Sequence, residues 1–206
     1  MNNRRTILDR WGITPAELTE LVDQNPSLRG ILLGYVAEKK FHDMFLENPA
    51  ITGIAKDDNH DRKMKGDRRI IYQNECFIIE VKSLQSNSIK KVNDDQWQGK
   101  CQVDASDNRT VTLPDGSQLK TTCLLRNEFD LLAVNCFAFD EQWRFAFALN
   151  ADLPKNTYKK YTDYQKQQLL PTLVTVTWPL QPPFTDNFLI LLNHLVQQRK
   201  SFRAHG

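Results

Sequence analysis

The sequence predicts an α/β protein with a mixed central β-sheet flanked by helices. Helical periodicity dominates the first 48 residues, apolar strand-like pairs follow at 68–82 and 129–149, and helix, strand and helix alternate after residue 162. This alternation is typical of a sheet that is covered by helices. With 206 residues, 40% of them hydrophobic, the chain is long enough for a buried core, so we expect a single domain over residues 1–206.

Two helices are expected in the first quarter of the chain. A short helix is predicted near residues 15–24, where Thr14 is the N-cap, Pro15 takes the first helical position and Glu17 completes a capping box. A longer helix is predicted over residues 27–48, beginning at a serine cap, because apolar residues recur there near helical spacing.

Strand pairs are expected at two places. RRIIY (68–72) and CFIIEVK (76–82) are rich in β-branched and aromatic residues and are separated by a short polar stretch, which predicts an antiparallel hairpin. A second hairpin is predicted from FDLLAVNCFAF (129–139) and WRFAFAL (143–149). Their apolar density indicates strands that are covered on both faces.

The remaining elements follow from turn and cap residues. LPDG (113–116) predicts a turn, and TDYQKQQLL (162–170) predicts a capped helix that ends before a proline. TLVTVTW (172–178) is expected to be a strand, and DNFLILLNHLVQQRK (186–200) a final helix.

Charge, cysteines and hydropathy narrow the classes of function. A formal charge of +2 does not by itself indicate a nucleic-acid partner, so the location of basic clusters matters more than their sum. The four cysteines, Cys76, Cys101, Cys123 and Cys136, form no CxxC or CxxH pair, which indicates free thiols in place of a zinc site. No apolar run approaches the roughly 18 residues that cross a bilayer, so we expect a cytoplasmic protein without membrane association.

Charged residues at the end of an apolar strand point to chemistry. Residues two apart in a strand share a face, so Glu80 and Lys82 are neighbours, roughly 6 to 7 Å apart at the backbone. If the hairpin turn centres near Asn74, Arg68 lies opposite Glu80. A centre half a residue earlier places Asp67 opposite Glu80, and either register brings the two acids close together.

Two carboxylates and a lysine at a buried strand end are costly unless they are paired or bind a metal ion. Mg²⁺ supplies this compensation because it prefers carboxylate oxygens and takes water and phosphate oxygens as further ligands. Such an ion polarises a phosphodiester and activates a bound water, while a nearby lysine orients that water or neutralises charge. The residues therefore indicate a hydrolytic phosphodiesterase that uses Mg²⁺, with Mn²⁺ as a substitute.

The spacing of these residues resembles a known nuclease motif. Gly66-Asp67, twelve intervening residues and then Glu80-Val81-Lys82 resemble the core motif of the PD-(D/E)XK nuclease superfamily, which includes many type II restriction endonucleases. Glycine stands where the name of the motif has proline. The resemblance covers roughly residues 30–105 and implies a restriction-endonuclease-like core over about residues 28–105.

The resemblance also implies roles for individual residues. Asp67 and Glu80 would hold the metal, and Lys82 would orient the attacking water. A glutamate on the helix before the motif would assist, and Glu38 meets this requirement. Asp57, Asp58 and Asp61 are rival metal-binding acids, but only Asp67 adjoins a predicted strand.

The function implied is that of a magnesium-dependent endonuclease for double-stranded DNA, most like a type II restriction endonuclease of a prokaryotic restriction-modification system. Cleavage of both strands implies two active sites, and hence a homodimer. Residues 106–206 are expected to complete the sheet and to contribute to DNA recognition. Two alternatives are open: a recombination or repair nuclease with the same core, and a non-catalytic DNA-binding protein whose acidic pair is structural.

Basic and hydrogen-bonding residues near the predicted site are candidates for contacts with DNA phosphates and base edges. Arg62, Lys63 and Lys65 precede the site, and the lysine- and tyrosine-rich segment 155–167 either grips a nucleic-acid backbone or forms an exposed helix entry. A solvated charged surface is the alternative interpretation. The predicted DNA-binding residues are Arg68, Arg69, Ser83, Lys90, Lys91, Asp107, Asn108 and Arg109.

Overall fold

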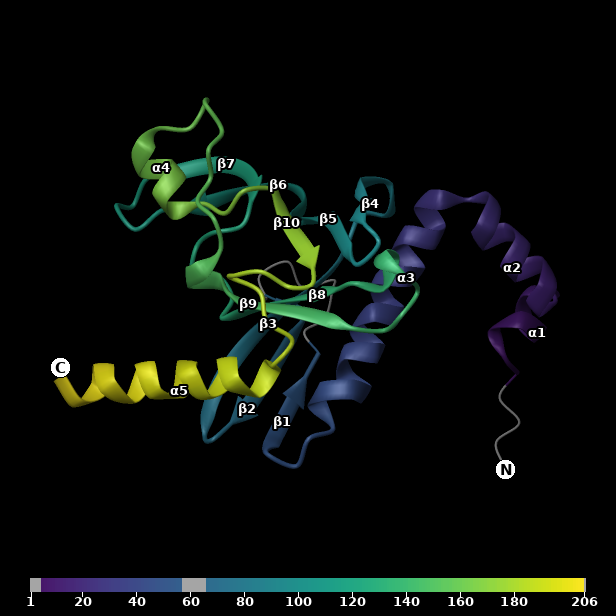
Figure 1. Ribbon diagram of the computed structural model, residues 1–206, viewed down its shortest axis with the longest axis horizontal. Helices are drawn as coiled ribbons and strands as arrows, with labels where there is room; N and C mark the ends of the chain where they lie inside the picture. The colour runs from purple at the N-terminus through teal and green to yellow at the C-terminus, as the bar shows by residue number, and fades with distance from the viewer. Residues whose placement is uncertain (1–4, 57–65, 206) are drawn as a thin grey trace. The chain divides into compact units, whose positions relative to one another are not determined.

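A computed structural model describes residues 5–56 and 66–205 of the chain (Figure 1). Backbone contacts divide it into two compact units, with the boundary between Val36 and Ala37. No helix in the two described ranges is both long and apolar enough to cross a membrane.

The first unit is helical. It contains α1 (Ile7–Trp11), α2 (Pro15–Gln24) and the first part of α3 (Pro26–Phe41). The predicted capping box of α2 is confirmed, because the Thr14 hydroxyl accepts a hydrogen bond from Glu17 N while the Glu17 carboxylate accepts one from Thr14 N. Neither α1 nor α2 contains a buried residue.

The second unit is built around a five-stranded mixed sheet in the order β1-β2-β3-β8-β9. Its strands are β1 (Ile51–Ala55), β2 (Arg68–Tyr72), β3 (Glu75–Ser83), β8 (Leu131–Asn135) and β9 (Phe145–Leu149). β3 and β8 run parallel, and the other neighbouring strands are antiparallel. The predicted mixed central sheet and both predicted strand pairs are therefore confirmed.

Two smaller antiparallel sheets and two helices complete the second unit. One sheet has the order β10-β5-β4, and the other pairs β6 with β7. The bounds are β4 (Lys90–Asn93), β5 (Gln96–Gln102), β6 (Asp104–Thr112), β7 (Gln118–Cys123), α4 (Asp163–Gln168), β10 (Leu173–Trp178) and α5 (Phe188–His205). The helices and the strand predicted after residue 162 are thus present.

The hairpin of β2 and β3 sets the register of the motif residues. Residues 73–74 both have positive φ, as a two-residue type I′ turn requires. Arg68 pairs with Ile79, so Asp67 lies directly opposite Glu80, and Asp67 N donates a hydrogen bond to Ile79 O at 3.0 Å. The register with Asp67 opposite Glu80 is confirmed.

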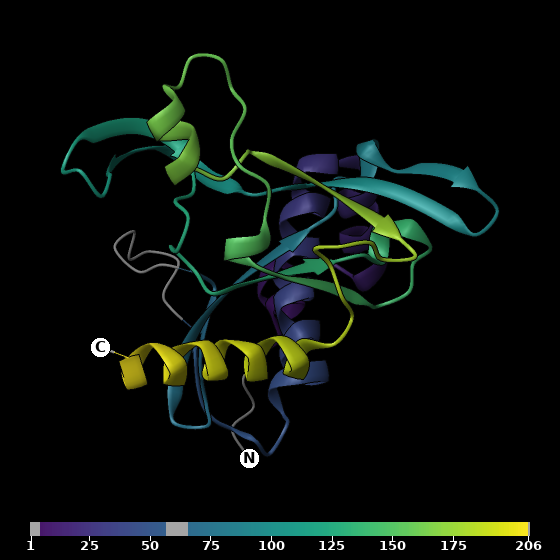
Figure 2. The same ribbon diagram turned by 60° about the vertical axis from the view of Figure 1, so that its left-hand side comes forward.

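The central sheet separates two hydrophobic clusters. On one face, Phe77, Ile79 and Val81 of β3 pack with α5 through Phe188 and Leu192. Figure 1 shows α5 lying across this face, and Figure 2 shows the same arrangement from a second direction. Burial of these side chains supplies the main stabilisation of the sheet, because apolar area removed from water drives folding.

The opposite face of the sheet packs against the β10-β5-β4 layer. Leu132 and Val134 of β8 share a cluster with Cys101 of β5 and Val176 of β10. Ile78, which alternates with the α5-facing residues of β3, packs against the same cluster. Glu80 and Lys82 therefore project from β3 toward this layered side of the sheet.

Polar contacts fix α5 to the start of β3. Arg203 forms two hydrogen bonds with the Glu75 carboxylate, and Arg199 donates to Asp130 at 2.6 Å. The Arg199 guanidinium also lies 4.3 Å from the centre of the Phe77 ring. These contacts hold the strand that carries Glu80 and Lys82 at its N-terminal end.

Some predicted elements differ from the structure in their bounds, and some elements were not predicted. The helix expected over 27–48 begins at Pro26, ends at Phe41 and continues as a π-helical turn, His42–Leu46. β1 was not predicted, because its five residues include Gly53 and show no clear alternation. The strand expected over 129–139 ends at Asn135, whose side-chain oxygen accepts a hydrogen bond from Phe137 N and starts a helical turn.

Gly66 forms the turn that leads into β2. Its φ is +76°, and a Cβ atom there would lie 2.3 Å from Ile78 Cγ2 and 3.2 Å from Ile79 O. Proline has φ fixed near about −65° and cannot take this conformation. The glycine in place of the proline of the motif is therefore a requirement of the local backbone.

We expect Gly66→Ala to lower the free energy of unfolding by about 2 kcal/mol, because it adds a steric clash to an unfavourable positive φ. Gly116→Ala is the matched control, since Gly116 has φ +82° but open space around its Cβ position. Urea denaturation of both variants measures the difference. If both variants lose the same free energy of unfolding, the steric contact with Ile78 does not destabilise the protein.

Candidate active site

Four charged residues from three elements make up the candidate site. Glu38 comes from the last turns of α3, Asp67 immediately precedes β2, and Glu80 and Lys82 lie on β3. Glu38 and Glu80 are 8% and 7% exposed, so both carboxylates are buried. Buried acids require compensation by positive charge, hydrogen bonds or bound cations.

Asp67 is held by the backbone of β3. Its Oδ2 accepts a hydrogen bond of 2.7 Å from Val81 N, and its own N–H donates to Ile79 O. Asp67 is thus hydrogen-bonded to the backbone of Ile79 and Val81, the two residues on either side of Glu80. No residue in the described part of the chain donates a hydrogen bond to Oδ1, which leaves that oxygen as a candidate ligand atom.

Glu80 and Lys82 form an ion pair along β3. Lys82 Nζ lies 2.6 Å from Glu80 Oε1. Burial lowers the pKa of Lys82, but the negative charges of Glu80 and Asp67 outweigh this effect and hold the pKa above its ordinary value. Lys82 is therefore a charged hydrogen-bond donor at neutral pH, and it is not a base.

Burial is the main reason that the pKa of Asp67 rises from 3.8 to about 7. The charge of Glu80 opposite it raises the pKa further, while Lys82 and the Val81 N–H act in the other direction. Glu38 adds a smaller increase. The acidic pair thus has more negative charge than Lys82 and its hydrogen bonds compensate.

Glu38 contacts two cations. Its Oε2 is 3.2 Å from Arg68 Nη2 and 2.9 Å from Lys56 Nζ. Arg68 is 6% exposed, and its Nη1 donates a hydrogen bond of 3.1 Å to Asp67 O. Glu38 is therefore linked to Asp67 through Arg68.

The predicted DNA-binding residues on β2 differ in exposure. Arg68 is buried against Glu38, so we assign it a positioning role in place of a contact with DNA. Arg69, the next residue, is partly exposed. The alternation follows from the strand period, which turns successive side chains to opposite faces.

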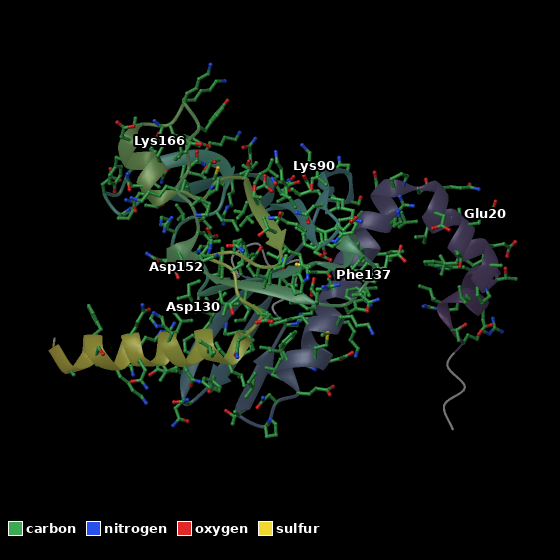
Figure 3. The ribbon with its side chains drawn as sticks, in the orientation of Figure 1. Glu20, Lys90, Asp130, Phe137, Asp152 and Lys166 are labelled. Carbon is green, nitrogen blue, oxygen red and sulfur yellow. The ribbon has the colours of Figure 1, made fainter. Side chains whose placement is uncertain are left out.

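The predicted residues at the end of β3 and after it lie near the layered side of the sheet. Ser83 accepts a hydrogen bond of 3.2 Å from Asn135 Nδ2. Lys90 and Lys91 are exposed on β4, where Figure 3 labels Lys90. Lys91 pairs with Asp94 at 3.0 Å, whereas no residue of the described ranges pairs with Lys90.

The remaining predicted DNA contacts lie on β6. Asp107 and Asn108 are exposed there. Both terminal nitrogens of Arg109 donate to the carboxylate of Glu128, which is 5% exposed. Arg109 therefore fixes β6 to the segment before β8, and a role in reading bases stays a prediction. Arg62, Lys63 and Lys65, with the rival acids Asp57, Asp58 and Asp61, lie outside the described residues.

A second group of metal-ligand side chains occurs in the π-helical turn and at the residue that follows it. His42, Asp43 and Glu47 have ligand atoms within 4.8 Å of one another. Asp43 already pairs with Lys39, and the group lies at the partly exposed end of α3. Exposed acidic clusters of this kind are common without a bound ion, and we assign no site to it.

Lys56 is a site residue that the sequence did not reveal. The register of β1 pairs Ala55 with Arg69, so Lys56 continues that register opposite Arg68. Recognition of ITGIA as a third antiparallel strand would have indicated this position. The signal is weak because the strand is short and contains a glycine.

Comparison with known proteins gives no family: the chain matches no protein-family model, no curated protein and no solved structure. The chemistry of the site is therefore inferred from its own groups. Two opposed carboxylates with excess negative charge fit a hard divalent cation, which prefers oxygen ligands. A charged lysine beside them fits the stabilisation of a developing negative charge.

The raised pKa of Asp67 predicts how stability depends on pH in the absence of divalent ions. The folded state binds more protons than the unfolded state between pH 3.8 and about 7, so the stabilising effect of this proton is lost as pH rises through 7. Relative to wild type, Asp67→Asn should gain about 2 kcal/mol in the free energy of unfolding between pH 5 and pH 8. Urea denaturation in a chelator measures this gain.

The control for this measurement is Asp152→Asn, because Asp152 is exposed and lies outside the site. Its stability should follow wild type at every pH. A constant difference between Asp67→Asn and wild type from pH 5 to pH 8 would contradict a raised pKa at Asp67.

Removal of one partner of the Glu38–Arg68 pair should leave a buried charge. We expect Arg68→Met to lower the free energy of unfolding by roughly 3 kcal/mol, whereas the double variant Glu38→Leu/Arg68→Met regains most of that loss. Arg10→Met, at an exposed arginine of α1, is the control and should cost little. A double variant that is no more stable than Arg68→Met would show that the two charges are not coupled.

Proposed function

We propose that the chain is a magnesium-dependent DNA endonuclease that hydrolyses phosphodiester bonds. The observation that carries this proposal is the pairing of Asp67 directly opposite Glu80, with Lys82 in contact with Glu80. The arrangement supports the resemblance to the PD-(D/E)XK nucleases, because it gathers all three motif residues on one side of the central sheet.

The order of elements supports the finer prediction of a restriction-endonuclease-like core. A helix that carries Glu38 precedes three antiparallel strands, β1, β2 and β3; Asp67 immediately precedes the second of these and Glu80 lies on the third. β8 then extends the sheet in parallel with β3. The result is a mixed sheet preceded by an acid-bearing helix, as the resemblance implies.

Asp67 and Glu80 would hold the metal, most directly through Asp67 Oδ1, which accepts no hydrogen bond within the described residues. Mg²⁺ or Mn²⁺ would polarise the scissile phosphate and lower the pKa of an attacking water. Asp67 is suited to this role because its backbone contacts on both sides restrict its movement. The raised pKa of Asp67 is the expected property of such a ligand before a cation balances its charge.

Lys82 would stabilise the pentavalent phosphate that forms when water attacks. As an ammonium group it donates hydrogen bonds to the attacking water or to a phosphate oxygen, and it accepts no proton. Glu80 holds the ammonium group in place at 2.6 Å. Arg68 and Glu38 keep the backbone of Asp67 in register through the hydrogen bond to Asp67 O.

A type II restriction endonuclease is the form of this activity that we propose. Cleavage of both strands of a duplex calls for two copies of the site, which a homodimer with twofold symmetry provides. Sequence reading would fall to residues 106–206 and to the β4–β5 hairpin with Lys90 and Lys91. Sequencing of the ends of cleaved fragments identifies this class, because a recombination or repair nuclease would not cut at one fixed sequence.

We expect the purified chain to cleave duplex DNA in Mg²⁺ or Mn²⁺ and to be inactive in a chelator. Asp67→Ala, Glu80→Ala and Lys82→Ala should each lower the cleavage rate at least about 100-fold, because each removes a group that acts on the reacting phosphate. Cleavage of plasmid DNA followed on gels measures the rates.

Arg10→Ala and Glu20→Ala are the matched controls, since both side chains are exposed and lie outside both the motif and residues 106–206. Both should cleave at the wild-type rate. Cleavage by all three motif variants at that rate would disprove the assignment of the site. DNA binding without cleavage under any metal condition would instead favour a non-catalytic DNA-binding protein.

A further inference from the structure

A second concave site lies in the C-terminal half of the chain. A cavity of about 390 Å³ opens between the end of β7, the segment before α4 and the start of β10. The described residues that line it include none of the four site residues. They are Thr122, Cys123, Asn156, Thr157, Tyr158, Tyr161, Pro171, Thr172 and Leu173.

Aromatic side chains form one wall of this cavity. The rings of Tyr158 and Tyr161 lie 5.6 Å apart at an angle of 74°. Tyr158 is 50% exposed and Leu173 is 41% exposed, and both line the cavity. A flat ring inserted into the cavity would cover this apolar surface.

The wall is fixed before any ligand binds. The Tyr161 hydroxyl shares a hydrogen bond of 2.7 Å with Thr121 Oγ1. Asn156, which is 5% exposed, donates to Leu170 O at 2.9 Å and accepts from Tyr158 N at 2.8 Å. The segment that carries both tyrosines is therefore preorganised, which limits the entropy lost on binding.

Hydroxyl groups and positive charge complete the site. Thr122, Thr157 and Thr172 line the cavity, and in the described part of the chain their hydroxyls have no hydrogen-bond partner. Residues 155–166 contain four lysines and one aspartate, and that aspartate pairs with Lys166, labelled in Figure 3. Lys160 Nζ lies 5.9 Å from the centre of the Tyr158 ring. No lining residue among those described is acidic.

We propose that this cavity binds one unstacked nucleobase, with Tyr158 stacking on the base and the exposed lysines Lys159 and Lys160 contacting adjacent phosphates. Aromatic rings stack on bases of any sequence, and hydroxyl groups pair with their polar edges. An aliphatic ligand would leave the hydroxyls unused, and an anionic ligand alone would not need the aromatic wall. DNA as the source of the base follows from the proposed function.

The test is the binding of a fluorescently labelled single-stranded 12-mer by the full chain in a chelator, where no cleavage occurs. An oligonucleotide of equal length with abasic residues keeps the phosphates and lacks the bases. Tyr158→Ala should weaken binding of the normal strand about tenfold and leave binding of the abasic strand unchanged. Tyr158→Phe should bind both as wild type does.

Tyr164→Ala is the matched control, because Tyr164 is an exposed tyrosine of the same lysine-rich segment but does not line the cavity. It should bind as wild type does. Equal affinity of wild type for normal and abasic strands, or an unchanged affinity of Tyr158→Ala, overturns the base site. A deoxynucleoside monophosphate that displaces the strand at micromolar concentration would identify a free nucleotide as the ligand and would overturn DNA as the source.

These outcomes are independent of the active site. Base-dependent binding that depends on Tyr158, in a chain that never cleaves DNA, would contradict the endonuclease and support the base site. Cleavage that requires Asp67, in a chain whose DNA binding is insensitive to Tyr158, would support the endonuclease and contradict the base site. Thermal unfolding of each variant confirms that it is folded.

Discussion

The pairing of β2 with β3 is the constraint on which the candidate site depends. A two-residue turn with positive φ at both positions places Asp67 opposite Glu80, and a shift of one residue would turn the facing side chains to opposite sides of the sheet. Gly66 permits the chain to approach β3 closely enough for Asp67 to bond with both Ile79 and Val81. Backbone geometry therefore determines which acids meet.

The charged residues of the site form two connected groups: a front layer of Asp67, Glu80 and Lys82, and a rear layer of Glu38, Arg68 and Lys56. In the front layer, Lys82 lies beside Asp67 and Glu80, and burial together with the charge of Glu80 raises the pKa of Asp67. In the rear layer, Glu38 is compensated by Arg68 and a neighbouring lysine. Arg68 connects the layers because it also bonds to the backbone of Asp67. The negative charge of Glu38 in the rear layer is balanced by side chains of the protein. The two carboxylates of the front layer carry a negative charge that a cation from solution would balance.

Much of this arrangement was predictable from the sequence, for identifiable physical reasons. β-branched residues revealed β2 and β3, and the strand period placed Glu80 and Lys82 on one face. The sequence left two possible registers for the β2–β3 hairpin. The choice between them depends on the backbone conformation of the two turn residues, which the sequence pattern does not determine. The ion pairs of Glu38 and Arg109 were not predictable, because each partner comes from a distant segment whose position only the tertiary fold defines.

Because β3 pairs in parallel with β8, the segment that contains the motif residues is shorter than the segment needed to complete the sheet around them. Glu80 and Lys82 end the motif on β3, yet this strand is paired on its other side with Leu131–Asn135, almost fifty residues later in the chain. A fragment that stops at residue 105 would leave β3 as an unprotected edge, with unpaired backbone groups beside apolar side chains. Such edges pair with other chains and aggregate. The C-terminal half is therefore needed to protect the edge of β3 from pairing with other chains.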